Sequence, residues 1–235
     1  MKASTRQAGN VLPPADAYLF DIDGTLLNSR DGVHYNAFHA AVREVYGIDS
    51  KIDGVPVHGN TDLGILRAVA RRAGLSDSDF ESKLPAAIDC MCAAARRNAG
   101  AMAPELCPAI CDLLDKLREE GKLLGVVSGN LEPIGWMKLQ AAGIKQFFAF
   151  GSFSNQRELR RDIFRHGIVL ARQRLGAAAG VCFVGDTPSD IEAAREVGSP
   201  ILAVATGIFS VADLMVHKPD ACVGCCSELA EGGKE

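Results

Sequence analysis

The 235-residue chain is 48% hydrophobic and has a formal net charge of −4, from 25 lysines and arginines against 29 aspartates and glutamates. It can bury the core of one large domain, or of one domain with a smaller insert, and its acidic balance argues against a nucleic-acid partner. No apolar stretch approaches the ~20 residues that a membrane-spanning helix needs, and the first residues lack the apolar core of a secretion signal. We therefore expect a cytoplasmic protein with no membrane partner.

Five apolar segments predict buried strands, because they are dense in Val, Leu, Ile and Phe without polar alternation. In chain order they are AYLFDID (17–23), KLLGVVSG (122–129), QFFAFGSF (146–153), VCFVGDT (181–187) and PILAVATG (200–207). A weaker strand pattern at 220–225 is compatible with one more edge strand. Strands that alternate with helices along the chain are typical of a parallel α/β sheet, which is the fold class we expect.

Four helix-like segments lie between or before the later strands, at 104–121, 132–143, 161–176 and 189–198. Each ends in glycine, the residue that most easily adopts the left-handed conformation found after a helix. The first of them is predicted to place five apolar residues on one face: Leu106, Ile110, Leu113, Leu114 and Leu117.

One region breaks the alternation, because residues 31–101 contain only helix-like patterns. We expect helices at 33–47 and 61–74, the second opened by Thr61 as its N-cap, and a third at 79–97 that is broken near Pro85. The flanking segments are small, polar or rich in Gly and Pro, as hinges often are. The expected organisation is therefore a core of residues 1–30 and 102–235 with a helical cap, residues 31–101, above the end of the first strand.

Two carboxylates, Asp21 and Asp23, end the first predicted strand. Residues two apart in an extended segment project to the same side. Two ionised carboxylates ~5 Å apart repel by roughly 3 kcal/mol at an effective dielectric constant near 20. A cation, a shared proton or a chemical task must compensate for such a pair.

Other polar residues follow the later strands, at the edge of a parallel sheet where ligands bind. Ser128, Gly129 and Asn130 end the second strand, and Asp186 and Asp190 follow the fourth. A cluster of carboxylates without histidine or cysteine suits Mg²⁺, which commonly acts with a substrate phosphate. One free carboxylate could then attack phosphorus, and a second could protonate the leaving oxygen and later activate water.

Each of these residues alone has an ordinary structural explanation. The DxDG segment is a common turn composition, Ser128 could be a turn residue, and Asp186 and Asp190 could cap the following helix. Their joint occurrence at successive strand ends favours the functional interpretation.

The segments DIDGTLL, VVSGN and VGDTPSDIEAAREVG resemble motifs one, two and four of the haloacid dehalogenase-like (HAD) superfamily. The helical insert resembles the C1 cap of its phosphoglycolate phosphatase and β-phosphoglucomutase-like branch. The resemblance implies a Rossmann-like core with an all-helical cap, and a Mg²⁺-dependent phosphatase acting on a small phosphorylated metabolite. It also implies roles for individual residues. Asp21 is the expected nucleophile and a metal ligand, Asp23 the acid/base whose carbonyl also binds Mg²⁺, Asp186 a metal ligand, Asp190 a support for the metal or its waters, and Gly24, Thr25, Ser128, Gly129 and Asn130 the phosphate-binding residues.

Motif three departs from the branch, which often has a lysine followed by proline where this chain has ELRRDIF. An arginine can balance phosphoryl charge through a bidentate fork. We favour Arg160, by its offset ahead of the following helix, with Arg161 second. Phosphonate hydrolysis would need a Schiff-base lysine in the cap, and neither Lys51 nor Lys83 has a matching context. The dehalogenase branch lacks the second aspartate, which is present here.

The segment PVHGNTD, residues 56–62, resembles the specificity loop of C1 caps, so His58 and Asn60 could meet the leaving group. Thr61 and Asp62 are expected to cap the next helix instead. The arginines of that helix, Arg67, Arg71 and Arg72, are expected to form a solvated face.

A sugar phosphomutase of the β-phosphoglucomutase type is the alternative activity, because it shares these motifs and this cap. A signalling receiver also uses clustered acids and Mg²⁺, but it has no helical insert after its first strand. An idle binding protein would tend to lose the acids that are all present here. The physiological substrate and the oligomeric state stay open, as does the role of the C-terminal cysteines. CVGCC at 222–226 holds a single CxxC, and we expect thiols packed as apolar groups rather than a zinc site.

Overall fold

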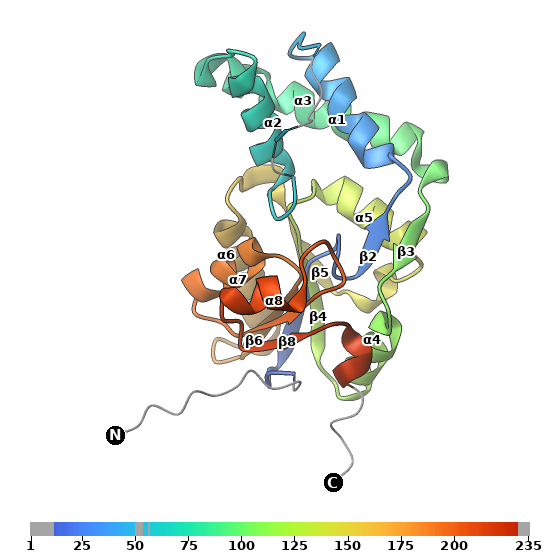
Figure 1. The fold of residues 1–235 in the computed structure, drawn as a ribbon, viewed down its shortest axis with the longest axis vertical. Coiled ribbons are helices and arrows are strands. Elements are labelled where there is room, and N and C mark those ends of the chain that lie inside the picture. Colours follow the sequence, from blue (N-terminus) through green and yellow to red (C-terminus); the bar gives the residue numbers. More distant parts are fainter. Residues whose placement is uncertain (1–11, 50–53, 56, 230–235) are drawn as a thin grey trace.

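A computed structural model describes residues 12–49, 54–55 and 57–229, and its core is a six-stranded sheet in the order β5-β4-β1-β6-β7-β8 (Figure 1). All its neighbouring strands are parallel. The strands are β1 (Ala17–Phe20), β4 (Leu123–Val127), β5 (Phe150–Ser152), β6 (Val181–Gly185), β7 (Ile201–Val204) and β8 (Ala221–Val223). The helices that follow them are α4 (Ile110–Glu119), α5 (Glu132–Ala141), α6 (Arg160–Leu175), α7 (Pro188–Glu196) and α8 (Val211–Val216). The predicted α/β fold is confirmed.

The central strand β1 is fully buried because helices cover both faces of the sheet. Its side chains alternate between two apolar clusters. Tyr18 and Phe20 pack in the cluster that contains residues of α4 and α5, whereas Ala17 and Leu19 pack in the one with residues of α6, α7 and α8. Because both faces of β1 are covered, its sequence is an unbroken run of apolar residues. The end of that run sets the position at which the chain leaves the sheet.

Phe183 of β6 has no exposed surface and stacks on Phe164 of α6, with ring centroids 4.2 Å apart. We expect Phe183→Ala to lower the free energy of unfolding by about 3–5 kcal/mol, because it leaves a cavity in the core. Val216→Ala, at a site 74% exposed, should change it by no more than about 0.5 kcal/mol. Urea denaturation followed by circular dichroism measures both, and equal losses would contradict this view of the core.

Three helices lie beyond the carboxyl ends of the strands: α1 (Val33–Glu44), α2 (Asp62–Arg72) and α3 (Asp77–Arg97) (Figure 1). They bury an apolar cluster of their own, which includes Phe38, Leu66, Phe80 and Met91. Leu131 and Ile134, from the start of α5, complete that cluster. The separate cluster supports the proposal that residues 31–101 form a cap domain seated on the core. None of the helices among the described residues is long and apolar enough to cross a membrane.

The two segments that connect the core with the cap form a short pair of antiparallel strands that the sequence did not predict, β2 (Leu27–Ser29) and β3 (Pro104–Leu106). Three residues are too few to show a periodic pattern. Leu106 is consequently 40% exposed in β3, and its predicted place on the buried face of a helix was wrong. Helix α4 begins only at Ile110, after Ala109 takes a left-handed conformation.

One predicted strand boundary and one predicted helix break were also wrong. Residues Lys145–Phe147 form a 3₁₀ turn, so the third predicted strand is reduced to β5. Helix α3 is continuous through Pro85, where the sequence predicted a break. Pro85 is exposed, while the opposite face of α3 is packed in the cap cluster. Tertiary packing therefore outweighs the loss of one helical hydrogen bond. The edge strand compatible with 220–225 is present as β8.

Candidate active site

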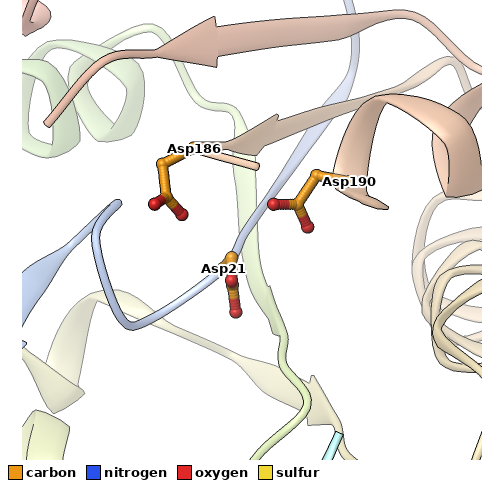
Figure 2. Close-up of side chains that lie close together, drawn as sticks. All are labelled: Asp21, Asp186 and Asp190. Carbon is orange, nitrogen blue, oxygen red and sulfur yellow. The ribbon is translucent and has the colours of Figure 1, made fainter. Parts of the chain in front are cut away.

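Three carboxylates meet where β1 and β6 end (Figure 2). Asp21 and Asp186 each follow directly on one of these paired strands, and Asp190 lies in the first turn of α7. One oxygen of each lies within 4.8 Å of one from the other two, and all three residues are buried. The parallel register of the two strands thus brings together residues that are distant in the sequence.

The charge on this cluster is incompletely balanced. Burial raises the pKa of Asp21 to about 6 although Arg160 opposes the shift, and Asp190 raises it further. Burial, together with the charges of Asp190 and Asp21, raises the pKa of Asp186 well above its usual range. Groups that resist ionisation in this way mark a place where one more cation would be stabilised.

The surroundings of Asp186 fit a small metal ion. Thr25 donates a hydrogen bond to Asp186 Oδ1 at 3.1 Å. A Cβ atom on Gly24 would lie 2.1 Å from Asp186 Oδ2, and one on Gly207 would lie 1.9 Å from the same atom. Both glycines are therefore required for the close approach of the chain to this carboxylate, and φ of Gly24 is +81°. A set of hard carboxylate oxygens in such a confined space suits Mg²⁺.

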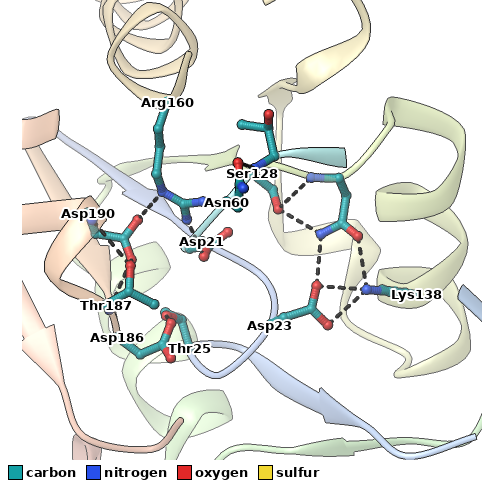
Figure 3. A network of polar contacts seen from close by, with 12 residues as sticks. Asp21, Asp23, Thr25, Asn60, Ser128, Lys138, Arg160, Asp186, Thr187 and Asp190 are labelled. Carbon is teal, nitrogen blue, oxygen red and sulfur yellow. Dashed lines mark hydrogen bonds and ion pairs between the residues drawn. The ribbon is translucent and has the colours of Figure 1, made fainter. Parts of the chain in front are cut away.

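Asp23 lies apart from this trio and has different partners (Figure 3). Its carboxylate accepts hydrogen bonds from Lys138 and Asn130. Partial burial raises its pKa, but the positive charge of Lys138 and the hydrogen bonds outweigh that effect and hold the pKa below its usual value. The two aspartates of the DxD segment therefore differ in environment: Asp21 resists ionisation and Asp23 favours it.

The loop after β4 contributes Ser128, Gly129 and Asn130 beside these acids. Ser128 is buried, and its Oγ accepts a hydrogen bond from Asn130 Nδ2 at 2.8 Å. A Cβ atom on Gly129 would lie 2.5 Å from the carbonyl oxygen of Asn60, in the cap loop. Asn130 is thus a partner of Asp23 and Ser128 in this structure, in addition to its expected place near the phosphate.

Of the two candidate arginines, the structure places Arg160 in the site. Its side chain is 9% exposed, and it forms ion pairs with both Asp21 and Asp190. Arg161 is 48% exposed and pairs with Glu196 on the surface. The two residues are adjacent on a helix, so about 100° of rotation separates their side chains.

Asp190 has partners for both of its oxygens. Oδ1 accepts a hydrogen bond from Arg160 Nε at 2.6 Å, and Oδ2 accepts from the backbone and hydroxyl of Thr187 in a capping box. Asp190 therefore caps α7 and orients Arg160 at once. This arrangement fits a supporting role beside the metal better than direct coordination.

A cavity of about 330 Å³ lies between the cap and the core, beside these groups. The core side includes Asp21, Asp23 and Lys138. From the cap, His58 and Asn60, which the sequence offered as possible contacts of the leaving group, line it together with residues that were not predicted: His34, Tyr35, Phe38 and Ile65. Lys83 does not line this cavity, and Lys51 lies outside the described residues.

Polar contacts seat the cap loop on the core. Thr61 caps α2 as predicted, accepting a hydrogen bond from the Gly64 N–H, and its hydroxyl donates to the Glu158 carbonyl at 2.7 Å. The prediction for Asp62 was wrong, because its carboxylate accepts from the Leu131 N–H at 2.7 Å and pairs with His34 instead of capping α2.

The prediction of a solvated arginine face is wrong for Arg67, whose side chain is only 15% exposed. Arg67 Nε donates to both carboxylate oxygens of Glu158, at 2.7 and 2.9 Å. Arg71 is 61% exposed, as expected. An ion pair between α2 and the segment before α6 thus also connects the cap with the core.

The haloacid dehalogenase-like hydrolase family matches residues 15–198 of this sequence. The chain belongs to that family. Among curated proteins it is similar to the phosphoglycolate phosphatase of Synechococcus elongatus, with 29% identity over 224 residues that cover 92% of this chain and 95% of the relative. It is also similar to the phosphoglycolate phosphatase of Escherichia coli K12, with 26% identity over 89% of each chain.

Solved structures share the fold of this chain. CbbY from Rhodobacter sphaeroides, in complex with phosphate, superposes with a TM-score of 0.66 at 18% identity, over 94% of this chain and 97% of that one. The expected membership of the HAD superfamily, and with it the expected enzyme class of hydrolase, is confirmed.

Sequence reasoning missed Lys138, which lies on the buried side of α5 with Ile134, Gly135 and Leu139. The signal was available: Lys138 follows Ile134 by one helical turn, so it falls on the same face. A lysine on an apolar face of a helix is rarely buried without a partner. Nothing local, however, identified Asp23 as that partner.

Proposed function

We propose that this HAD-like hydrolase is a Mg²⁺-dependent phosphatase that cleaves the monoester of a small phosphorylated metabolite through an aspartyl phosphate on Asp21. The observation that carries the proposal is the convergence of Asp21, Asp186, Asp190 and Arg160 at the strand ends, beside a cavity between the cap and the core. The phosphatase names of the curated relatives support it.

In the first step, an Asp21 oxygen attacks phosphorus while the bond to the ester oxygen breaks. The electron pair of that bond leaves with the oxygen, which takes a proton from Asp23. The form of the enzyme that reacts is therefore the one in which Asp23 is protonated, although Lys138 favours the ionised carboxylate. Arg160, Ser128 and the backbone N–H groups of the neighbouring loops would hold the phosphoryl oxygens as their charge redistributes. Positioning and electrostatic stabilisation supply most of the catalysis in reactions of this kind.

In the second step, water attacks the aspartyl phosphate, and Asp23 accepts a proton from that water. The bond between phosphorus and Asp21 breaks, which restores the Asp21 carboxylate and releases inorganic phosphate. Mg²⁺, held by Asp21, Asp186 and the backbone carbonyl of Asp23, would neutralise charge on the phosphoryl group. Asp190 would contribute by orienting Arg160, which donates a hydrogen bond to it.

Phosphate release from a panel of phosphorylated metabolites, with Mg²⁺ or with EDTA, tests the proposal. We expect metal-dependent release from at least one ester, and the best substrate would identify the metabolic role. No release from any ester would contradict the proposal. The mutase alternative is not favoured, because the similar curated proteins are named phosphatases. Interconversion of hexose phosphates with little free phosphate would restore it.

We extend the proposal to a reducing, cytoplasmic location, which the eight unpaired cysteine thiols support.

Gly129→Ala tests whether the close contact between the cap loop and the core is needed for activity. The added Cβ would meet the Asn60 carbonyl oxygen at 2.5 Å and Thr61 Cα at 3.0 Å, and both are backbone atoms. We expect kcat/KM to fall by about 100-fold, as displacements near 1 Å can cause, with little change in the free energy of unfolding. Gly100→Ala, where a Cβ would meet nothing within 4 Å, is the control. Unchanged kcat/KM for Gly129→Ala would show that cap seating at this loop is unimportant.

A further inference from the structure

Lys138 is an unusual residue for a helix packed against the core, because its side chain is only 4% exposed. Removing an ammonium group from water is expensive, and the loss is offset only where ion pairing and hydrogen bonds are nearly ideal. Its environment therefore decides whether Lys138 has a task beyond packing.

All three N–H donors of Lys138 have acceptors within hydrogen-bond distance. Nζ lies 2.8 Å from Asp23 Oδ1, 2.7 Å from Asp23 Oδ2 and 2.9 Å from Asn130 Oδ1 (Figure 3). Asn130 uses its opposite end to donate to Asp23 Oδ2 and to Ser128 Oγ, both at 2.8 Å. Lys138 thus fixes Asp23 directly, and it also fixes the amide that holds Asp23 from a second direction.

The held carboxylate still faces the cavity. The Asp23 side chain is 43% exposed, and Asp23 lines the space between cap and core together with Asp21. Lys138 also lines this space, but its side chain is only 4% exposed, so Asp23 is the more accessible of the two to a leaving group. A buried ion pair is weak evidence for stability, since apolar side chains of similar volume often stabilise a fold as well or better.

We propose that Lys138 is a positioning residue that holds the Asp23 carboxylate, directly and through Asn130, in place for proton exchange with the leaving-group oxygen. The inference rests on the proposed phosphatase function. In that reaction the ester P–O bond breaks as Asp21 bonds to phosphorus, and the departing oxygen takes its proton from Asp23. Lys138 neither bonds to phosphorus nor gives up a proton.

The dependence of rate on the leaving group separates this role from a purely structural one. An alkyl phosphate, such as glycerol phosphate, releases an alkoxide that must be protonated. Nitrophenyl phosphate releases a stable nitrophenolate that needs no proton. We therefore expect Lys138→Met to lower kcat/KM for the alkyl ester by about 100-fold, the lower range for general acid catalysis, and to change kcat/KM for nitrophenyl phosphate by less than about threefold.

Asp23→Asn should show the same selective loss, and the double variant should be no worse than Asp23→Asn alone, because the two residues act as one unit. Lys116→Met makes the same chemical change on the exposed face of α4 and should leave both rates unchanged. Circular dichroism and thermal unfolding monitor the fold. If Lys138→Met does not fold, Lys138→Gln replaces it; glutamine is shorter and uncharged, so the same selective loss for the alkyl ester is expected, to a smaller degree.

Equal losses for both esters, or no loss for either, would overturn the role of Lys138 while leaving the phosphatase intact. Absence of Asp21-dependent phosphate release by the wild-type protein from nitrophenyl phosphate and from every alkyl ester of the metabolite panel is a different result. It would contradict the proposed function, and the role of Lys138 would fall with it.

Discussion

Replacing Asp21 with asparagine is expected to lower kcat for phosphate release by at least about 10⁴-fold, the scale of loss seen when a catalytic nucleophile is removed. Asparagine has nearly the same shape, but its amide cannot attack phosphorus and carries no charge to bind a metal. The side chain is buried among Asp186, Asp190 and Arg160. Because asparagine occupies nearly the same volume as aspartate, the substitution should not disturb the packing of these neighbours.

The stability of this variant distinguishes a catalytic from a structural loss. Burial already raises the pKa of Asp21 to about 6, so its charge is unfavourable in the fold, apart from its attraction to Arg160. We therefore expect the Tm of Asp21→Asn to be equal to or higher than that of the wild type. Asp112→Asn, the same change at an exposed position of α4, should leave kcat unchanged. A variant that retains substantial activity would show that Asp21 is not the nucleophile.

Removal of divalent metal is expected to abolish phosphate release, and added Mg²⁺ should restore it. The physical reason is the uncompensated charge of the carboxylates at the strand ends, where burial and mutual repulsion raise the pKa of Asp186 well above its usual range. Asp186→Asn removes one expected ligand while keeping its shape. We expect it to weaken Mg²⁺ binding by at least about 100-fold, because even outer partners of metal ligands typically contribute 10- to 100-fold.

Isothermal titration calorimetry of Mg²⁺ with the metal-free protein measures this effect without relying on activity. Wild-type heat of binding that disappears in Asp186→Asn would support the site. Full activity in the presence of EDTA, or binding unchanged by the substitution, would contradict it.

The sequence placed the candidate acids at the strand ends because each lies in a short contiguous motif directly after an apolar run. Asp21 and Asp186 then meet because β1 and β6 are parallel neighbours. The choice between Arg160 and Arg161 needed the structure, since adjacent residues of a helix differ only in the direction they face. Burial with Asp21 and Asp190 distinguishes Arg160.

The remaining contacts depend on how the cap lies against the core, which no local pattern encodes. In the sequence, Arg67 is one more charged residue of an amphipathic helix. Only the structure shows that Glu158 is its partner. Asp62 reads as a helix cap until Leu131 supplies an N–H from the core. Lys138 was detectable as a charge on an apolar face, but its pairing with Asp23 joins two segments far apart in the chain.

The most direct test of the account is the chemical identity of the phosphorylated enzyme. Asp23→Asn should form the aspartyl phosphate from nitrophenyl phosphate, which needs no acid, and should then hydrolyse it slowly because water is not activated. Acid quenching followed by peptide mass spectrometry should find a phosphoryl group on Asp21 in this variant. Phosphate on another residue, or continued release of phosphate with no phosphoryl group on the protein, would contradict the proposed mechanism.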